Sequence, residues 1–222
     1  MKKFISGLFT LCLFNLAIST ANASPITGLF NTGAGISTDQ ETDTHYTLTD
    51  TGGNFIFGGF GAAAVGPGFP ITPWIADNGT SHWLTPTANR SQSFDTTQEG
   101  TYVWSLAFDL TGYNPTSAGF AGRFSADNNA TAILNGNVIG NATDFTQWYS
   151  FAATSNLFVS GINKLEFVVT NLAYNEGANP TGLRVEFTSS DISSVPLPGA
   201  AWLFLSSLLG FLAINRKKHI LI

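Results

Sequence analysis

The chain has 222 residues, with 9 Lys and Arg against 14 Asp and Glu and a formal net charge of −5. Five of the cations lie in the two terminal segments, whereas all 14 acids lie between Ser24 and Val195, so this middle segment has 4 cations and a net charge of −10. Such a surface repels phosphate backbones and anionic headgroups, which excludes nucleic acid and peripheral membrane binding as expected functions. It favours neutral or cationic partners.

The N-terminal segment, residues 1–23, has the parts of a secretory signal peptide. Lys2 and Lys3 precede an apolar run over residues 8–18, and a small-residue cleavage site follows. The residues of that site are Ala21, Ala23 and Ser24. We expect export through the Sec machinery and cleavage by signal peptidase after Ala23. Because Cys12 is removed with this segment, the mature chain has no cysteine and cannot form a disulfide.

The next part of the chain, residues 31–82, is rich in glycine and aromatic residues and lacks a clear period. A phosphate-binding loop would require Gly-Lys-Ser/Thr between a strand and a helix, and neither feature is evident. We therefore expect irregular strands and loops along the edge of the domain.

Trp74 and Trp83 fall in this loop-rich part, close in sequence to Asp77 and Asn78. Indole faces stack on sugar rings, while carboxylates and amides hydrogen-bond sugar hydroxyls. We therefore take these four residues as the candidate glycan-binding site, which requires the indoles to be exposed. The alternative is that each Trp belongs to the core.

From residue 101 on, alternating apolar residues predict β-strands. In the run 101–110 one face carries Tyr102, Trp104, Leu106, Phe108 and Leu110. Similar runs cover residues 120–124, 130–134, 164–170 and 183–188. Turn signals lie between them at residues 112–115, 127–129, 135–137, 160–161 and 179–182. The pattern predicts an all-β fold, an antiparallel β-sandwich over residues 24–194. The expected core includes Leu106, Phe108, Leu134, Phe167, Val169 and Val185.

Asn135-Gly136 lies between two apolar segments and predicts a hairpin with a type I′ turn. Leu134-Asn135-Gly136 is followed by Gly161-Ile162-Asn163-Lys164-Leu165 and a strand. This order resembles the jelly-roll core of galactose-binding-like domains over about residues 101–187. The resemblance implies a jelly-roll sandwich, but the fold serves sugar binding, protein docking and plain spacing alike.

Motifs for catalysis and metal binding are mostly absent. His45 and His82 are the histidines left in the middle segment, and neither has metal-ligand spacing. No Gly-Xaa-Ser-Xaa-Gly elbow occurs, so we do not expect an enzyme. No cofactor is expected. The galactose-binding-like resemblance leaves calcium open at Asp95, Asp109 and Asp127, although no Asp-Xaa-Asp-Xaa-Asp-Gly loop is present.

The C-terminal segment, residues 195–222, predicts a membrane-spanning helix at about residues 199–214. This stretch is apolar apart from Ser206 and Ser207, and a basic cluster follows it on the side expected to be cytoplasmic. A buried helix of a globular domain would normally keep a polar face.

This segment resembles the PEP-CTERM sorting signal of Gram-negative bacteria, which combines a proline motif, a short apolar helix and a basic stop. The matching residues are Val195, Pro196, Leu197, Pro198, Arg216, Lys217 and Lys218. The resemblance implies recognition at the inner membrane by an exosortase-type transpeptidase, then cleavage near the prolines and release to the cell surface or the extracellular polymer. Leu197 stands where the family's usual motif has Glu, and an uncleaved C-terminal anchor is the alternative.

Two functions are compatible with the sequence. In the first, an exported cell-surface or extracellular-matrix protein binds polysaccharide through an aromatic and amide site. In the second, the protein is purely structural, has no small ligand and is held by an uncleaved anchor. Exposed Trp residues beside Asn and Asp would favour the first function, and burial of every Trp would favour the second.

Overall fold

The computed structural model describes residues 23–38, 40–49, 70–86, 93–95, 97–195, 204 and 206–209, and describes residues 55–56 and 59–62 by their backbone only. Residues 22–195 form one compact unit, which the following paragraphs describe. In the C-terminal segment, residues 204 and 206–209 are helical. Within the described residues, no helix has the length and apolar character needed to cross a membrane. Most of the predicted membrane helix and of the signal peptide lies outside the described residues.

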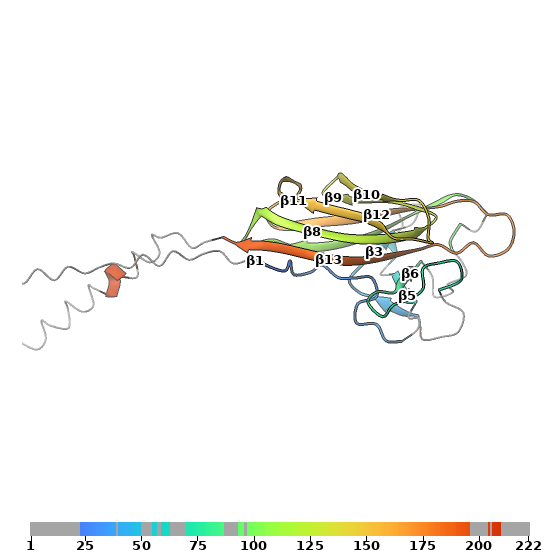
Figure 1. The fold of residues 1–222 in the computed structure, drawn as a ribbon, viewed down its shortest axis with the longest axis horizontal. Helices are drawn as coiled ribbons and strands as arrows, with labels where there is room; N and C mark the ends of the chain where they lie inside the picture. Colours follow the sequence, from blue (N-terminus) through green and yellow to red (C-terminus); the bar gives the residue numbers. More distant parts are fainter. Residues whose placement is uncertain are drawn as a thin grey trace, which may run out of the picture. The chain divides into compact units, whose positions relative to one another are not determined.

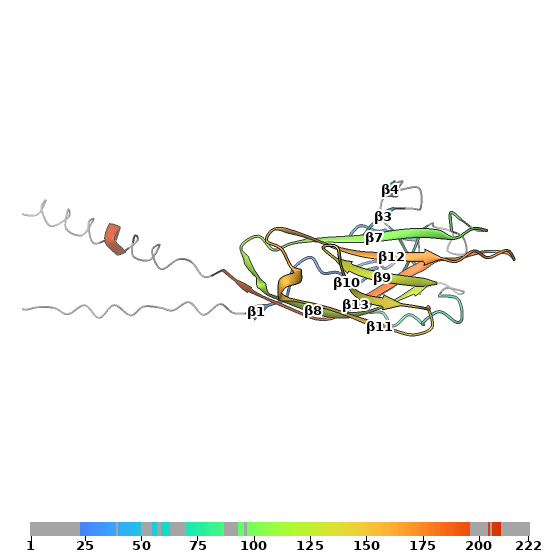
Figure 2. The ribbon, with the colours of Figure 1, turned by 90° about the horizontal axis from the view of Figure 1, so that it is seen from above.

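The compact unit is built from two antiparallel sheets (Figures 1 and 2). The first sheet has the order β11-β8-β13-β6-β5-β2, with β1 paired to β13, and the second has the order β10-β9-β12-β7-β3-β4. The strands of the first sheet are β1 (Ala23–Ser24), β2 (Glu41–Asp43), β5 (Gly59–Ala62), β6 (Trp83–Thr85), β8 (Tyr113–Asp127), β11 (Tyr149–Thr154) and β13 (Gly182–Ser194). Those of the second are β3 (Thr47–Thr49), β4 (Phe55–Ile56), β7 (Gly100–Asp109), β9 (Asn129–Leu134), β10 (Asn137–Ala142) and β12 (Ile162–Asn171). A 3-10 turn, η1 (Ser155–Leu157), follows β11.

The predicted all-β sandwich is therefore confirmed. From β7 to β13 the chain crosses repeatedly between the sheets, as it does in jelly-roll sandwiches. The central strands are long and in continuous register, with Phe167 of β12 opposite Trp104 of β7 and Ala132 of β9. This continuity fixes which side chains of the three strands share the inner face.

Aromatic side chains dominate the core between the sheets. Along β7, buried residues of the inner face alternate with half-buried or exposed residues of the outer face, as the sequence predicts. The expected core residues are all buried: Leu106, Phe108, Leu134, Phe167, Val169 and Val185. Phe120 contacts Phe151 and Phe187 edge to face, and Phe151 contacts Phe167 in the same way. These contacts favour one packing arrangement of the phenyl rings over others.

β8 is longer than the sequence predicts. The alternation is clear only over residues 120–124, whereas the strand runs from Tyr113 to Asp127. The turn predicted at residues 112–115 is present at Gly112, which has a φ of 84°, but it ends before Tyr113. Pro115 lies inside the strand, near a register shift of the β8–β13 ladder. Because a proline cannot donate to a ladder, such an irregularity is where a strand tolerates it.

The predicted hairpin at Asn135-Gly136 is present. Both residues have positive φ, 49° and 83°, as a type I′ turn requires. The Asn135 amide also donates to Asn163 Oδ1 at 2.8 Å, and Asn163 in turn donates to the carbonyls of Val159 and Gly161. The two asparagines therefore join the hairpin to the turn that precedes β12.

The chain ends of the unit and the candidate site lie at opposite ends of the sandwich. At one end, Ala23 pairs with Ser193 and the amide of Val195 donates to the Gly112 carbonyl, so both chain ends of the unit lie there. At the other end, Asp127 pairs with Gly182 where β8 ends and β13 begins. β13 has 13 residues and spans about 40 Å at the usual rise of a strand. The candidate site described next lies at the second end.

Candidate functional site

A pocket of about 280 Å³ lies where four connections meet at the second end of the sandwich. They are the segment before β6, the turn between β8 and β9, the loop between β10 and β11, and the loop between β12 and β13. The lining residues are Ile71, Pro73, Trp74, Asp127, Asn128, Phe145, Tyr174, Ala178, Asn179 and Pro180. Aromatic walls with a few polar groups are typical of small-ligand sites, and this volume is at the lower end of their range.

The segment before β6 is fastened by backbone and indole hydrogen bonds. The amide of Trp74 donates to the Ile71 carbonyl at 2.7 Å, and the amide of Ile75 donates to the Phe145 carbonyl at 2.9 Å. The Trp83 indole donates to the Ile75 carbonyl at 3.0 Å, and its ring lies 4.4 Å from that of Trp74. Trp83 therefore supports Trp74 from behind, and Trp74 forms the pocket wall.

Gly182 allows Trp74 to lie close to β13. A Cβ atom at this position would lie 3.0 Å from Trp74 Cη2 and 2.9 Å from the Leu84 carbonyl oxygen. Both approaches are shorter than normal van der Waals contacts. The absence of a side chain at the first residue of β13 is thus a condition for the shape of the pocket.

Asp127 contributes a buried carboxylate to the pocket. The Trp74 indole donates to Asp127 Oδ2 at 2.9 Å, and the side chain is only 5% exposed. Burial raises the pKa of Asp127 to about 7, and the indole hydrogen bond only partly opposes this effect. Asp127 is the one acidic residue among those that line the pocket, and none of these described residues is basic.

The loop between β12 and β13 supplies the remaining polar and aromatic groups. Asn179 is buried and donates to the Leu172 carbonyl at 3.0 Å, while the Leu172 amide donates to Asn128 Oδ1 at 2.7 Å. The Thr181 hydroxyl donates to the Asp127 carbonyl. Tyr174 is 49% exposed, so its ring is accessible from solvent. The loop is thus fixed at its base and presents an aromatic side chain at its surface.

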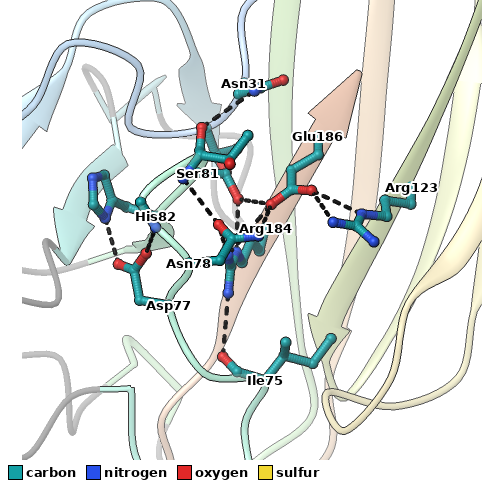
Figure 3. A network of polar contacts seen from close by, with 12 residues as sticks. Asn31, Ile75, Asp77, Asn78, Ser81, His82, Arg123, Arg184 and Glu186 are labelled. Atoms are coloured by element: carbon teal, nitrogen blue, oxygen red, sulfur yellow. Dashed lines mark hydrogen bonds and ion pairs between the residues drawn. The ribbon is translucent and has the colours of Figure 1, made fainter. Parts of the chain in front are cut away.

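A buried polar network lies beside the pocket on β13 (Figure 3). Arg184 is fully buried, and its guanidinium donates to the Ala76 carbonyl at 2.7 Å, Asn78 Oδ1 at 2.7 Å and Ser81 Oγ at 2.7 Å. Glu186 accepts from Asn78 at 2.9 Å and from Ser81 at 2.9 Å. The network therefore ties the segment before β6 to the first sheet.

Arg123 extends the network from Glu186 to Trp148. Arg123 donates to Glu186 Oε2 at 2.8 Å and lies over the Trp148 ring, with its Cζ 4.5 Å from the ring centroid. Burial would raise the pKa of Glu186, but the hydrogen bonds from Asn78, Arg123 and Ser81 outweigh this effect and lower the pKa. The buried carboxylate of Glu186 is thus paired with cations, unlike that of Asp127.

The predicted glycan-binding residues are brought together, but not as expected. Trp74 and Trp83 are 5% and 1% exposed, so the expectation of exposed indoles is wrong. The reason is that they pack against each other and against Ile71, Ile75 and Phe145 in a small core of their own. Asp77 hydrogen-bonds to His82, with the Asp77 Oδ2 and His82 Nδ1 atoms 2.5 Å apart, and Asn78 belongs to the Arg184 network.

Sequence reasoning missed Tyr174, Asn179 and Phe145 as pocket residues and considered Asp127 only as a calcium ligand. Asn179-Pro180 was recognised as a turn, but nothing local indicates that this turn faces Trp74, which is more than 100 residues away. The aromatic residue within a turn-rich loop, Tyr174, was the one available signal.

The three acids considered for calcium do not form one site. Asp95 accepts from the Tyr102 hydroxyl near the start of β7, whereas Asp109 lies at the other end of that strand and caps Thr111. Asp127 lies in the pocket. In the part of the chain that the structure describes, no group of three or more His, Cys, Asp or Glu residues is placed to hold a metal ion.

The sorting residues are only partly described. Ala23 and Ser24 form β1, and Val195 follows β13. Ala21, Pro196, Leu197, Pro198, Arg216, Lys217 and Lys218 lie outside the described residues.

No family model and no curated protein matches the chain. Solved structures that are similar to it in part include the following three. A PA14 sugar-binding domain from an RTX adhesin has a TM-score of 0.25 and 14% identity over 44% of this chain and 54% of that domain. A family 35 carbohydrate-binding module from an environmental isolate has a TM-score of 0.26 and 16% identity over 48% of this chain and 77% of that module. The GH31 α-xylosidase of Xanthomonas citri has a TM-score of 0.30 and 11% identity over 70% of this chain and 14% of the enzyme. Likeness at this level identifies neither a family nor a ligand.

Proposed function

We propose that this chain is an exported cell-surface or extracellular-matrix protein whose β-sandwich binds polysaccharide at the pocket formed by Trp74, Phe145 and Tyr174. The observation that carries this proposal is the arrangement of the pocket itself. A Trp and a Tyr from two distant segments line the same hollow with a carboxylate and the amides of two asparagines. Aromatic faces suit the C–H groups of a sugar ring, and the polar groups suit its hydroxyls.

The size of the pocket favours one sugar unit of a longer chain rather than an enclosed oligosaccharide. A volume of about 280 Å³ leaves the rest of a polymer in solvent. Contacts of this extent support weak binding, with dissociation constants of about micromolar to millimolar, or roughly −8 to −4 kcal/mol. Where several copies of the domain lie on one surface, the repeated sugar of a polymer would bind them together and raise the avidity.

Export and sorting form the second part of the proposal. The signal-peptide pattern of residues 1–23 and the PEP-CTERM-like tail of residues 195–222 support an inner-membrane intermediate. An exosortase-type enzyme then cleaves the tail, and the domain reaches the cell surface or the matrix. β1 and the end of β13 pair at one end of the sandwich, and the pocket lies at the other. Attachment through the C-terminal end of the domain would therefore leave the pocket accessible to polymer.

The second candidate is a structural matrix or surface protein with no small ligand, held by an uncleaved anchor. The burial of Trp74, Trp83 and Trp104 favours it, because these indoles serve the core. Trp148 is half-buried beneath Arg123 and belongs to the polar network.

A direct comparison of two variants separates these functions. We expect the purified domain, residues 24–195, to be retained by at least one bacterial matrix polysaccharide on a glycan array. Tyr174→Ala should weaken this retention without loss of stability, because Tyr174 is half exposed and lies at the pocket. Leu172→Ala is the matched control, since Leu172 is similarly exposed in the same loop but does not line the pocket. Failure of the folded domain to bind any polysaccharide would favour the structural role.

A further inference from the structure

The carboxylate of Asp127 has an environment that a structural role does not explain. It is buried, accepts one hydrogen bond, from the Trp74 indole, and lies in a pocket whose described lining residues include no cation. By contrast, the buried Glu186 is paired with Arg123 and with Arg184. Buried carboxylates in proteins are normally paired with a cation or a metal, because an uncompensated one is costly.

A neutral side chain could make the same internal contact. Asparagine is close to aspartate in size, and its amide oxygen accepts a hydrogen bond from an indole N–H. The negative charge strengthens the contact with Trp74, but this gain does not offset the cost of burial, which raises the pKa of the carboxyl to about 7. A group that enters the pocket and donates to the carboxylate would supply the missing compensation.

The aromatic walls favour a cation as that group. Trp74 and Tyr174 line the pocket together with Asp127, and Phe145 lies 6.3 Å from Trp74 between ring centroids. Indole and phenol faces attract ammonium groups, and the attraction grows when the site excludes water. A ligand ammonium in this pocket would meet one carboxylate and aromatic rings.

We propose that the pocket selects a sugar with a free amino group, whose ammonium pairs with the Asp127 carboxylate and lies against Trp74 and Tyr174. This inference rests on the proposed polysaccharide function and specifies its substrate class. A net charge of −10 on the middle segment would add a general attraction for a partly deacetylated, cationic polymer. The pocket supplies the selectivity, because the surface charge alone does not distinguish one basic polymer from another.

The test uses two probes that differ only in the amino group. A hexamer of β-1,4-linked glucosamine and the fully N-acetylated hexamer are titrated by calorimetry near pH 7 into the mature domain, residues 24–195. We expect the glucosamine hexamer to bind about tenfold more tightly or better, because a charge-assisted hydrogen bond is stronger than a neutral one. Asp127→Asn should remove this preference. Glu176→Gln removes an exposed carboxylate from the loop between β12 and β13 and should keep the preference.

A second readout does not require a variant. The Asp127 carboxyl carbon, followed by NMR across pH, should show a lower apparent pKa when the glucosamine hexamer is bound and an unchanged one with the acetylated hexamer. Equal binding of the two hexamers, or a preference that survives Asp127→Asn, would overturn the inference and leave a neutral glycan as the ligand. Binding of neither hexamer, together with no retention of any polysaccharide, would remove both the inference and the proposed function.

Discussion

At the scale of single residues, Asp127 links the stability of the domain to pH. Its pKa rises from an ordinary value of 3.8 to about 7 on folding, so between these values the folded state holds a proton that the unfolded state has lost. Raising the pH through this window therefore lowers the free energy of unfolding, by a few kcal/mol in all, since one pKa unit is worth about 1.4 kcal/mol.

Replacing Asp127 with asparagine should remove this loss. We expect Asp127→Asn to have a higher free energy of unfolding than the parent at pH 8 and a similar one at pH 4, as measured by urea denaturation. Asp144→Asn is the control, and it should lower the free energy of unfolding at pH 8 where Asp127→Asn raises it. The reason is that hydrogen bonds from Tyr149 and Thr146 hold the pKa of Asp144 below its usual range. Equal stability of Asp127→Asn and the parent at pH 8 would show that the carboxylate is compensated.

Gly182 tests the position of Trp74. In Gly182→Ala the new methyl group would press on Trp74 and on the Leu84 carbonyl, so we expect a loss of about 1–3 kcal/mol and a changed Trp fluorescence spectrum. Gly119→Ala, in β8, adds the same methyl group with its nearest contact at 3.5 Å and should cost much less. Equal effects of the two changes would contradict the close packing of Trp74 on β13.

At the scale of elements, the strand phase is the firmest prediction from sequence. Phe167 lies at the centre of β12, is fully buried and contacts Phe124 and Phe151. We expect Phe167→Ala to cost about 3–5 kcal/mol in chemical denaturation. Val138→Ala in β10, where the side chain is 60% exposed, should change stability by less than about 0.5 kcal/mol. A loss below about 1 kcal/mol for Phe167→Ala would place that side chain outside the core.

The sequence predicted the elements whose signals are local. Apolar and polar residues alternate clearly in β7, β9 and β12, so these strands were predictable. The turn at Asn135-Gly136 was predictable because these residue types favour the positive φ angles that it requires. β8 was predicted too short because residues 112–115 have the composition of a turn, whereas pairing with β13 extends the strand back to Tyr113. A two-residue period says nothing of such tertiary pairing.

The candidate site could be predicted only in part, for a related reason. Trp74 was identified as a site residue from its neighbours, but its burial depends on Trp83, on Phe145 and on the absence of a side chain at Gly182. The pocket joins residues from positions 71 to 180, and no local pattern specifies that these loops meet. The chemistry of Asp127 follows from its burial, which is a property of the assembled sandwich.

At the scale of the whole molecule, processing at both ends is the prediction that decides localisation. We expect the intact mass of the secreted protein to correspond to a chain that starts at Ser24 and ends between Val195 and Gly199. Replacing Pro196 and Pro198 with Ala should block release, whereas changing the distant Pro180 should not. Recovery of the protein only in membranes, with its tail intact to Ile222, would make the segment a plain anchor.

The central claim is that a sugar binds in the pocket at Trp74. Because the Trp74 indole N–H donates to Asp127, its proton–nitrogen NMR signal reports directly on that pocket, while the indole of Trp104 lies in the core. On titration with the polysaccharide that the domain retains, we predict a saturable shift of the Trp74 indole signal and no shift of the Trp104 signal. A polysaccharide that leaves the Trp74 signal unchanged at saturation would contradict the claim.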